Sequence, residues 1–243
     1  MERGEPLVQA VLLVGGRGTR LGSLTNDMPK PLVPIHGRPF LSYLLTFLRR
    51  NGVLDVLLCT GYRHEQIQEY CGDGSSWGLR VAYSRETEPL GTAGALAHAS
   101  RQLTSDPVAL LNGDTFLDVS LPEVVAFHTA CSAGATLLAL RQKNAGEFGV
   151  LDADGEGRIT AFREKGQTSG AALINAGMYI LSREFIDQVC GFGCRPLSLE
   201  LDVLPQQAVA GNLRAFVGDG YFLDIGTPDR YRRAITELPE VGS

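Results

Sequence analysis

A glycine- and arginine-rich stretch near the N-terminus is the part of this sequence best suited to binding an anion. Gly15, Gly16 and Gly18 follow an apolar run, and Arg17 and Arg20 lie among them. Glycine permits positive φ and lets a ligand approach the backbone, and the amide N–H groups of such a loop can bind an anion. The arginines add full positive charge, so the residue types favour a phosphate ligand.

Lys30 adds a third cation a little further along, between Pro29 and Pro31. A residue before proline is pushed towards extended conformations, so Lys30 is expected on a stiff segment. We interpret the stretch from Gly15 to Pro31 as a phosphate-binding loop. A glycine-rich turn with solvated arginines is the alternative. The stretch matches neither a Walker A motif nor the Gly-x-Gly-x-x-Gly of dinucleotide sites, which disfavours a nicotinamide-dependent oxidoreductase.

Two aspartates further along the chain have the chemistry of magnesium ligands. Asp114 directly follows an apolar run, and Asp224 follows Tyr221-Phe222-Leu223. Mg²⁺ takes oxygen ligands and usually bridges one or two carboxylates to substrate phosphates. Each aspartate alone also fits a loop residue that caps a turn, and the sequence does not show that the two converge.

Composition limits the classes of function. The chain has 243 residues, 44% of them hydrophobic, and a net charge of −5, which argues against general nucleic-acid binding. No apolar run is long enough to span a membrane, and the N-terminus does not resemble a signal peptide. Five scattered cysteines suit a reducing compartment, so a cytoplasmic location is expected.

The hydrophobic pattern predicts an α/β protein with a mostly parallel sheet and helices on both faces. In the first half, strands are expected over 7–14, 53–59, 79–83 and 107–111, and helices over 38–50, 63–70 and 93–103. In the second half, a helix is expected over 121–131, a hairpin over 148–162, strands over 135–140, 173–181, 213–217 and 221–223, and a closing helix over 228–238. Ligands of such sheets bind at the carboxyl ends of strands, where the glycine loop and Asp114 both fall.

Seven short motifs in series resemble the sugar-1-phosphate nucleotidylyltransferase family. They are Gly15–Leu21 with Pro29-Lys30-Pro31, Glu88–Gly94, Asn112-Gly113-Asp114, Phe148-Gly149-Val150, Glu164-Lys165, Asn175-Ala176-Gly177 and Asp224–Pro228. The resemblance covers nearly the whole chain. It implies a single Rossmann-like nucleotidyltransferase domain over 1–243, with an inserted β-rich sugar-binding portion. A nucleotide-binding half is expected over about 1–118, and a sugar-phosphate-binding half with the closing helix over about 119–243.

The resemblance also implies a role for each matching residue. Catalytic roles fall to Arg20, Lys30 and Lys165. Nucleotide binding falls to Leu13, Gly15, Gly16, Gly18, Thr19, Glu86, Gly91, Thr92, Asn112 and Gly113. The residues implied in sugar-phosphate binding are Gly149, Glu164, Lys165, Asn175 and Gly177. The implied cofactor is Mg²⁺, with Asp114 and Asp224 as its ligands.

Within the family, the chain is most similar to D-glycero-α-D-manno-heptose 1-phosphate guanylyltransferases, and next to mannose-1-phosphate guanylyltransferases. The implied partners are GTP or another nucleoside triphosphate and a sugar 1-phosphate, with no nucleic acid or membrane. The products would be GDP-heptose, for surface polysaccharide synthesis, and pyrophosphate. A homodimer is left open.

Glu86 is the residue we expect to select guanine, because a carboxylate can accept from both N1–H and the N2 amino group of that base. A helical-cap or solvated role for Glu86 is equally open. Thymidylyl or uridylyl transfer to glucose 1-phosphate, and a catalytically silent sensor of nucleotide sugars, are the remaining alternatives.

Overall fold

The computed structural model describes residues 7–163, 166, 170–193 and 195–238, which fall into two compact units. Unit 1 comprises Met1–Pro89, Leu111–Asp118 and Tyr221–Ser243, and unit 2 comprises Leu90–Leu110 and Val119–Gly220. The units differ from the expected halves in two segments. Leu90–Leu110 belongs to unit 2, and the C-terminal segment returns to unit 1. Each segment of unit 2 is therefore joined along the chain to unit 1 at both of its ends.

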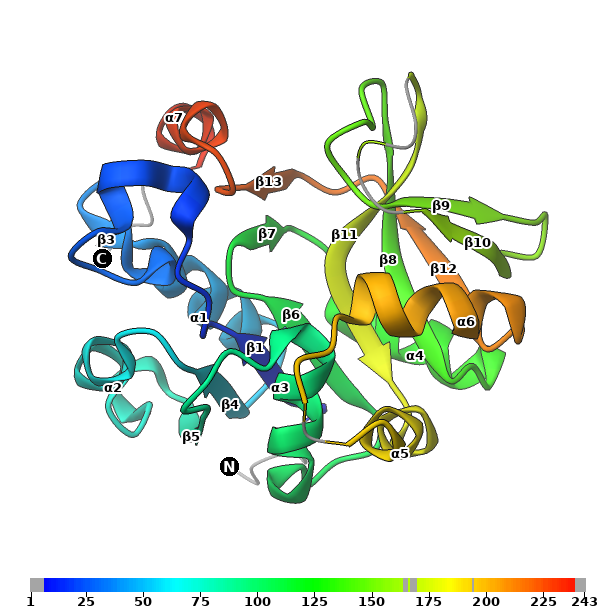
Figure 1. The fold of residues 1–243 in the computed structure, drawn as a ribbon, viewed down its shortest axis with the longest axis horizontal. Helices are drawn as coiled ribbons and strands as arrows, with labels where there is room; N and C mark the ends of the chain where they lie inside the picture. Colours follow the sequence, from blue (N-terminus) through cyan, green and yellow to red (C-terminus); the bar gives the residue numbers. More distant parts are fainter. Residues whose placement is uncertain (1–6, 164–165, 167–169, 194, 239–243) are drawn as a thin grey trace. The chain divides into compact units, whose positions relative to one another are not determined.

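Unit 1 contains three parallel strands: β1 (Gln9–Leu13), β4 (Asp55–Thr60) and β5 (Arg80–Arg85). Helices α1 (Phe40–Arg50) and α2 (His64–Cys71) connect them in sequence (Figure 1). β1 and β4 are buried along most of their length, as their continuous apolar runs predict for a parallel sheet covered on both faces. The carboxyl ends of these strands lie together, because parallel strands run in one direction.

The last strand pair of unit 1 joins segments that are far apart in the sequence. β6 (Val108–Asn112) leads into β7 (Thr115–Leu117), which pairs antiparallel with β13 (Phe222–Asp224). Helix α7 (Pro228–Glu237) follows and packs against β13. Thr227 caps this helix by accepting a hydrogen bond from the Arg230 amide at 3.4 Å. The predicted closing helix is therefore present.

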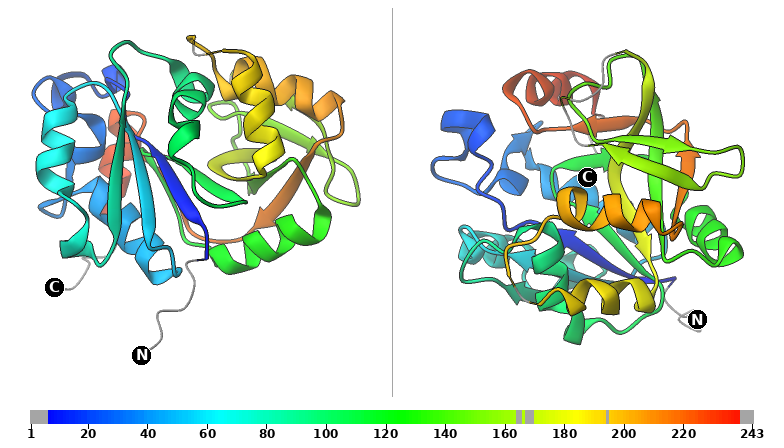
Figure 2. Two further views of the ribbon diagram at one scale, coloured as in Figure 1. Left: turned by 90° about the horizontal axis from the view of Figure 1, so that it is seen from below. Right: turned by 45° about the vertical axis from the view of Figure 1, so that its right-hand side comes forward.

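Unit 2 contains a mixed sheet. β8 (Ala135–Gln142) pairs antiparallel with β11 (Ala172–Leu181) and parallel with β12 (Leu213–Gly218). β9 (Val150–Ala153) and β10 (Ile159–Arg163) form the predicted hairpin (Figure 2), and β9 also pairs with β11. The strand–helix alternation and the β-rich second part confirm the predicted fold class.

The helices of unit 2 are only partly those expected. α4 (Leu121–Cys131) contacts β8 and β12, and α3 (Gly91–Ala99) packs on α5 (Arg183–Gly191). The prediction contained no helix between residues 182 and 212. The structure has α5, a π-helical turn over Leu199–Val203 and α6 (Leu204–Val209) there. α6 has six residues and a proline in its first turn, too short a span for a helical period to show in sequence.

Each helix in the described part of the chain is too short or too polar to cross a bilayer.

Candidate active site

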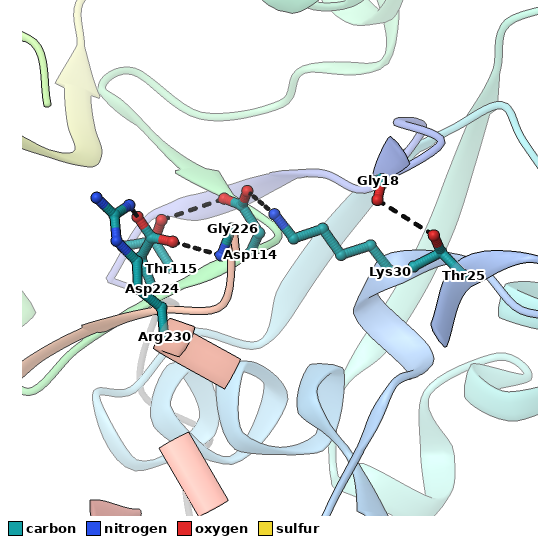
Figure 3. A network of polar contacts seen from close by, with 8 residues as sticks. All are labelled: Gly18, Thr25, Lys30, Asp114, Thr115, Asp224, Gly226 and Arg230. Atoms are coloured by element: carbon teal, nitrogen blue, oxygen red, sulfur yellow. Dashed lines mark hydrogen bonds and ion pairs between the residues drawn. The ribbon is translucent and has the colours of Figure 1, made fainter. Parts of the chain in front are cut away.

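Asp114 and Asp224 lie on the paired segments of unit 1 around β7 and β13. In that pair Asp224 is opposite Thr115, and the Ile225 N–H donates to the Asp114 carbonyl at 2.9 Å. Burial raises the pKa of Asp224, and the Asp114 charge raises it further, as expected for neighbouring carboxylates. Figure 3 shows both side chains with their partners, which are Lys30 and Thr115 for Asp114 and Gly226 and Arg230 for Asp224.

Lys30 forms an ion pair with Asp114. Its Nζ lies 2.5 Å from Asp114 Oδ2, and the side chain of Lys30 is 8% exposed against 32% for Asp114 (Figure 3). Burial alone would raise the pKa of Asp114. The Lys30 charge and hydrogen bond, the Thr115 hydroxyl and the Arg20 charge outweigh burial and lower that pKa. The Asp114 carboxyl is therefore held ionised, with Lys30 Nζ beside it.

Asp224 has a different environment, which the sequence analysis did not foresee. Its Oδ2 pairs with Arg230 Nη1, and its Oδ1 accepts the Gly226 N–H (Figure 3). Burial and the Asp114 charge raise the pKa of Asp224, while Arg230, the Gly226 amide and Lys30 act in the opposite direction. Arg230 lies in the first turn of α7, and nothing in its sequence spacing sets it apart from the other arginines of that helix.

The predicted phosphate loop leads from β1 into a 3₁₀ segment over Thr19–Thr25. Gly18 has φ +66°, and a Cβ there would come within 2.8 Å of Lys30 Cβ, so glycine is required both by conformation and by space. The Gly18 carbonyl accepts the Thr25 hydroxyl at 3.1 Å. Gly16, Arg17, Thr19 and Arg20 of this loop are exposed.

Glu86 lies where β1, β4 and β5 end. Its amide donates to the Thr60 carbonyl at 2.8 Å. A Cβ at Gly15 or Gly61 would meet Glu86 Oε1 at 2.7 Å, so these two glycines provide the space that the carboxylate occupies. Gly15 and Glu86, both predicted to bind nucleotide, are thus neighbours in unit 1.

The remaining nucleotide residues fall in two places. Leu13 ends β1, and its carbonyl accepts the Gly113 N–H at 3.0 Å, next to Asn112 at the end of β6. Gly91 and Thr92 begin α3 in unit 2.

The described sugar-binding candidates cluster within unit 2. The Asn175 N–H donates to the Gly149 carbonyl at 2.8 Å, and Asn175 Oδ1 accepts the Gly177 N–H at 3.1 Å. Asn175 Nδ2 donates to the Tyr179 hydroxyl at 2.7 Å. These contacts coincide with the irregular register of β11 between Asn175 and Tyr179. Glu164 and Lys165 lie outside the described residues.

Glu200 is a polar centre of unit 2 that sequence reasoning missed. Its two carboxylate oxygens accept from Thr92 at 2.8 Å, Ser198 at 3.0 Å and Tyr179 at 3.3 Å. Glu200 lies in the π-helical turn, a conformation that is frequent at functional sites. Through Tyr179 it is linked to Asn175, so two motifs distant in sequence share one hydrogen-bond network.

The donors of unit 1 fit Mg²⁺ that is completed by phosphate. Asp114 and Asp224 offer only carboxylate oxygens, and Mg²⁺ sites of this kind use one or two carboxylates plus substrate phosphates. In the described segments, no group of three or more His, Cys, Asp or Glu side chains could hold a metal ion by itself. The pair fits an ion whose remaining ligands are the phosphates of a nucleotide.

The fold is similar to those of solved structures. The structure superposes on HddC from Yersinia pseudotuberculosis, solved in complex with GMP-PN, with a TM-score of 0.83 and 31% identity over 96% of this chain and 100% of that one. It also superposes on a putative glucose-1-phosphate thymidylyltransferase from Bacillus anthracis with a TM-score of 0.86; at 21% identity this supports the fold alone.

Sequence comparison identifies guanylyltransferases as relatives of this chain. The chain is 38% identical to D-glycero-alpha-D-manno-heptose 1-phosphate guanylyltransferase of Aneurinibacillus thermoaerophilus, over 95% of this chain and 98% of the relative. It is 36% identical to mannose-1-phosphate guanylyltransferase of Mycobacterium tuberculosis, of which it spans 64%. The model of the Nucleotidyl transferase family matches residues 9–241. The chain is therefore an enzyme that belongs to the nucleotidyl transferase family.

Proposed function

We propose that this enzyme transfers a guanylyl group from GTP to D-glycero-α-D-manno-heptose 1-phosphate, giving GDP-heptose and pyrophosphate. Two relatives that bear this activity in their names, from Aneurinibacillus thermoaerophilus and Campylobacter jejuni, are 38% and 34% identical and match it over 98% and 97% of their own length. The HddC structure with its guanine nucleotide analogue supports the choice of nucleotide. Mannose 1-phosphate is the alternative acceptor, and thymidylyl or uridylyl transfer to glucose 1-phosphate is the alternative reaction.

The observation that carries the reaction type is the cluster of Lys30, Asp114 and Asp224 in unit 1. In the proposed reaction a sugar phosphate oxygen forms a bond to the α-phosphorus of GTP, and the bond from that phosphorus to the bridging oxygen of pyrophosphate breaks. The nucleophile is already an anion, so no general base is required. Catalysis then consists of positioning two anions and stabilising charge.

In this scheme, the buried Lys30 contacts the α-phosphate, and Arg20 with the loop amides holds the β- and γ-phosphates. Asp114 and Asp224 would hold Mg²⁺, which would neutralise the charge that develops on the phosphates. In unit 2, Gly149, Asn175 and Gly177 bind the sugar. We propose Glu164 and Lys165 for the sugar and its phosphate on the family resemblance alone.

Glu86 is proposed to select guanine. Its carboxylate is bounded by Gly15 and Gly61 at the ends of the parallel strands, and a carboxylate accepts two N–H donors of guanine that uracil and thymine lack. We expect Glu86→Gln to lower kcat/KM for GTP by roughly 10²-fold, about 3 kcal/mol, because the amide keeps one acceptor oxygen but places an N–H donor opposite the second donor of guanine. Glu65→Gln is the control, since Glu65 is an exposed partner of Arg85. An equal loss with every nucleotide would contradict a role in base selection.

Pyrophosphate release with Mg²⁺ tests the whole proposal. The assay crosses GTP, dTTP, UTP and CTP with heptose 1-phosphate, mannose 1-phosphate and glucose 1-phosphate. We expect the highest kcat/KM with GTP and the heptose. Higher activity with mannose 1-phosphate would replace the sugar, and higher activity with dTTP or UTP would replace both the nucleotide and the role of Glu86.

A further inference from the structure

Both oxygens of the Asp224 carboxylate are held by groups from the segment that follows it. Arg230 pairs with Oδ2, and the Gly226 N–H donates to Oδ1 (Figure 3). The ion pair is largely shielded from water, because the side chains of Arg230 and Asp224 are only 17% and 14% exposed. The capped first turn of α7 fixes the backbone of Arg230.

The two carboxylates of the proposed metal site are therefore each neutralised by a cation of the protein. Lys30 pairs with Asp114, and Arg230 pairs with Asp224. The four groups sum to zero charge. A divalent cation that binds alone would leave this cluster with two positive charges, next to two cations that are mostly shielded from solvent. Repulsion of this kind is strong where water is scarce.

A nucleoside triphosphate changes this balance. Its phosphates bring several negative charges and give Lys30 and the metal ion anionic oxygens to contact. The same carboxylates can then accept Mg²⁺ without an uncompensated excess of positive charge. Arg230 differs from Lys30 in its position: it belongs to α7, beyond Asp224, and stays beside that carboxylate as a fixed charge.

We propose that Arg230 is a positioning residue that holds the Asp224 carboxylate in place and weakens metal binding in the nucleotide-free enzyme. This inference rests on the proposed function, since it requires Asp114 and Asp224 to be the metal ligands. A purely structural ion pair between β13 and α7 would stabilise the fold without opposing the metal.

The test is a titration of the nucleotide-free enzyme with Mn²⁺, a spin probe for the magnesium site, in which free Mn²⁺ is followed by electron paramagnetic resonance. We expect Arg230→Gln to bind Mn²⁺ about tenfold more tightly than the wild type, because one repelling charge is lost. Arg230→Lys keeps the charge and should retain the wild-type affinity. Arg232→Gln is the matched control, since Arg232 lies on the same helix, pairs with Asp229 and is 74% exposed.

The Asp224→Asn variant distinguishes a wrong role for Arg230 from a wrong position of the metal site. Unchanged or weaker Mn²⁺ binding in Arg230→Gln overturns the role of Arg230, provided that Asp224→Asn still abolishes binding in an otherwise wild-type chain. If Asp224→Asn leaves Mn²⁺ binding unchanged, both the proposed metal site and the inference are wrong. Arg230→Met fills similar space without a charge, and it repeats the measurement if the glutamine variant lacks a cooperative melt.

Discussion

At the scale of single residues, Lys30 and Asp114 form an ion pair in which the lysine is nearly buried. Lys30 is nearly buried, so removing its carboxylate partner leaves an ammonium without compensation. We expect Asp114→Asn to lower the free energy of unfolding by about 1–3 kcal/mol at neutral pH, a range reduced because Asp114 is partly exposed. Urea unfolding measures the difference. Asp55→Asn is the control, because Asp55 pairs with the exposed Arg80 and should change stability by less than about 1 kcal/mol.

The same residue gives this stability a defined pH dependence. The folded-state pKa of Asp114 lies below its ordinary value. Ionised Asp114 therefore stabilises the fold at pH values above the pKa that this residue has in the unfolded chain. The contribution is complete above about pH 5 and is lost as the pH falls through the lowered pKa. The difference in the free energy of unfolding between the wild type and Asp114→Asn should therefore become smaller as the pH falls. A difference that becomes larger as the pH falls would contradict this assignment.

At the scale of elements, Thr92 connects the start of α3 to the π-helical turn of unit 2. Its hydroxyl donates to Glu200 at 2.8 Å and accepts the Leu199 N–H at 2.7 Å. Thr92→Val keeps the shape and removes both bonds, leaving a carboxylate and an amide less satisfied. We expect a loss of about 1–3 kcal/mol in the free energy of unfolding, measured by urea denaturation. Thr129→Val, at an exposed position on α4, is the control. An equal loss of stability in that variant would contradict a specific contribution of the Thr92 hydrogen bonds.

Elements with long apolar runs could be predicted from the sequence, and short pairings could not. β1, β4 and β6 are buried runs, and the Thr227–Pro228 start of α7 has recognisable cap chemistry. The pairing of β7 with β13 joins three-residue strands separated by about a hundred residues of chain, and no local pattern encodes it. The same pairing brings Asp114 to Asp224, so the sequence could name both aspartates but could not place them together.

Arg230 and Glu200 were missed for a related reason. Arg230 is one of several charged residues on a short amphipathic helix, and Glu200 lies in a π-helical turn with no repeating pattern. What distinguishes them is the partner that each meets in the fold: Asp224 for Arg230, and Thr92 with Tyr179 for Glu200.

At the scale of the whole molecule, the connectivity links the stability of the two units. Both segments of unit 2 begin and end in unit 1, so unfolding of unit 1 releases every end that anchors unit 2. A ligand that contacts unit 1 should therefore protect the entire chain, and GTP is proposed to contact Lys30 and Glu86 of that unit. At a GTP concentration about 100 times its Kd, binding adds about 2.7 kcal/mol to the free energy of unfolding. For a chain of this size, we expect Tm to rise by roughly 5–10 °C.

The chain offers two probes that report on this linkage separately. Trp77, the single tryptophan, belongs to unit 1, whereas far-ultraviolet circular dichroism reports on the helices and strands of both units. With Mg²⁺ and GTP, and no sugar phosphate to allow turnover, both melting curves should shift together. A shift confined to the tryptophan signal would mean that the units unfold independently. UTP and dTTP should shift Tm less than GTP, because they cannot offer Glu86 the paired donors of guanine; equal shifts would remove base selection from that carboxylate.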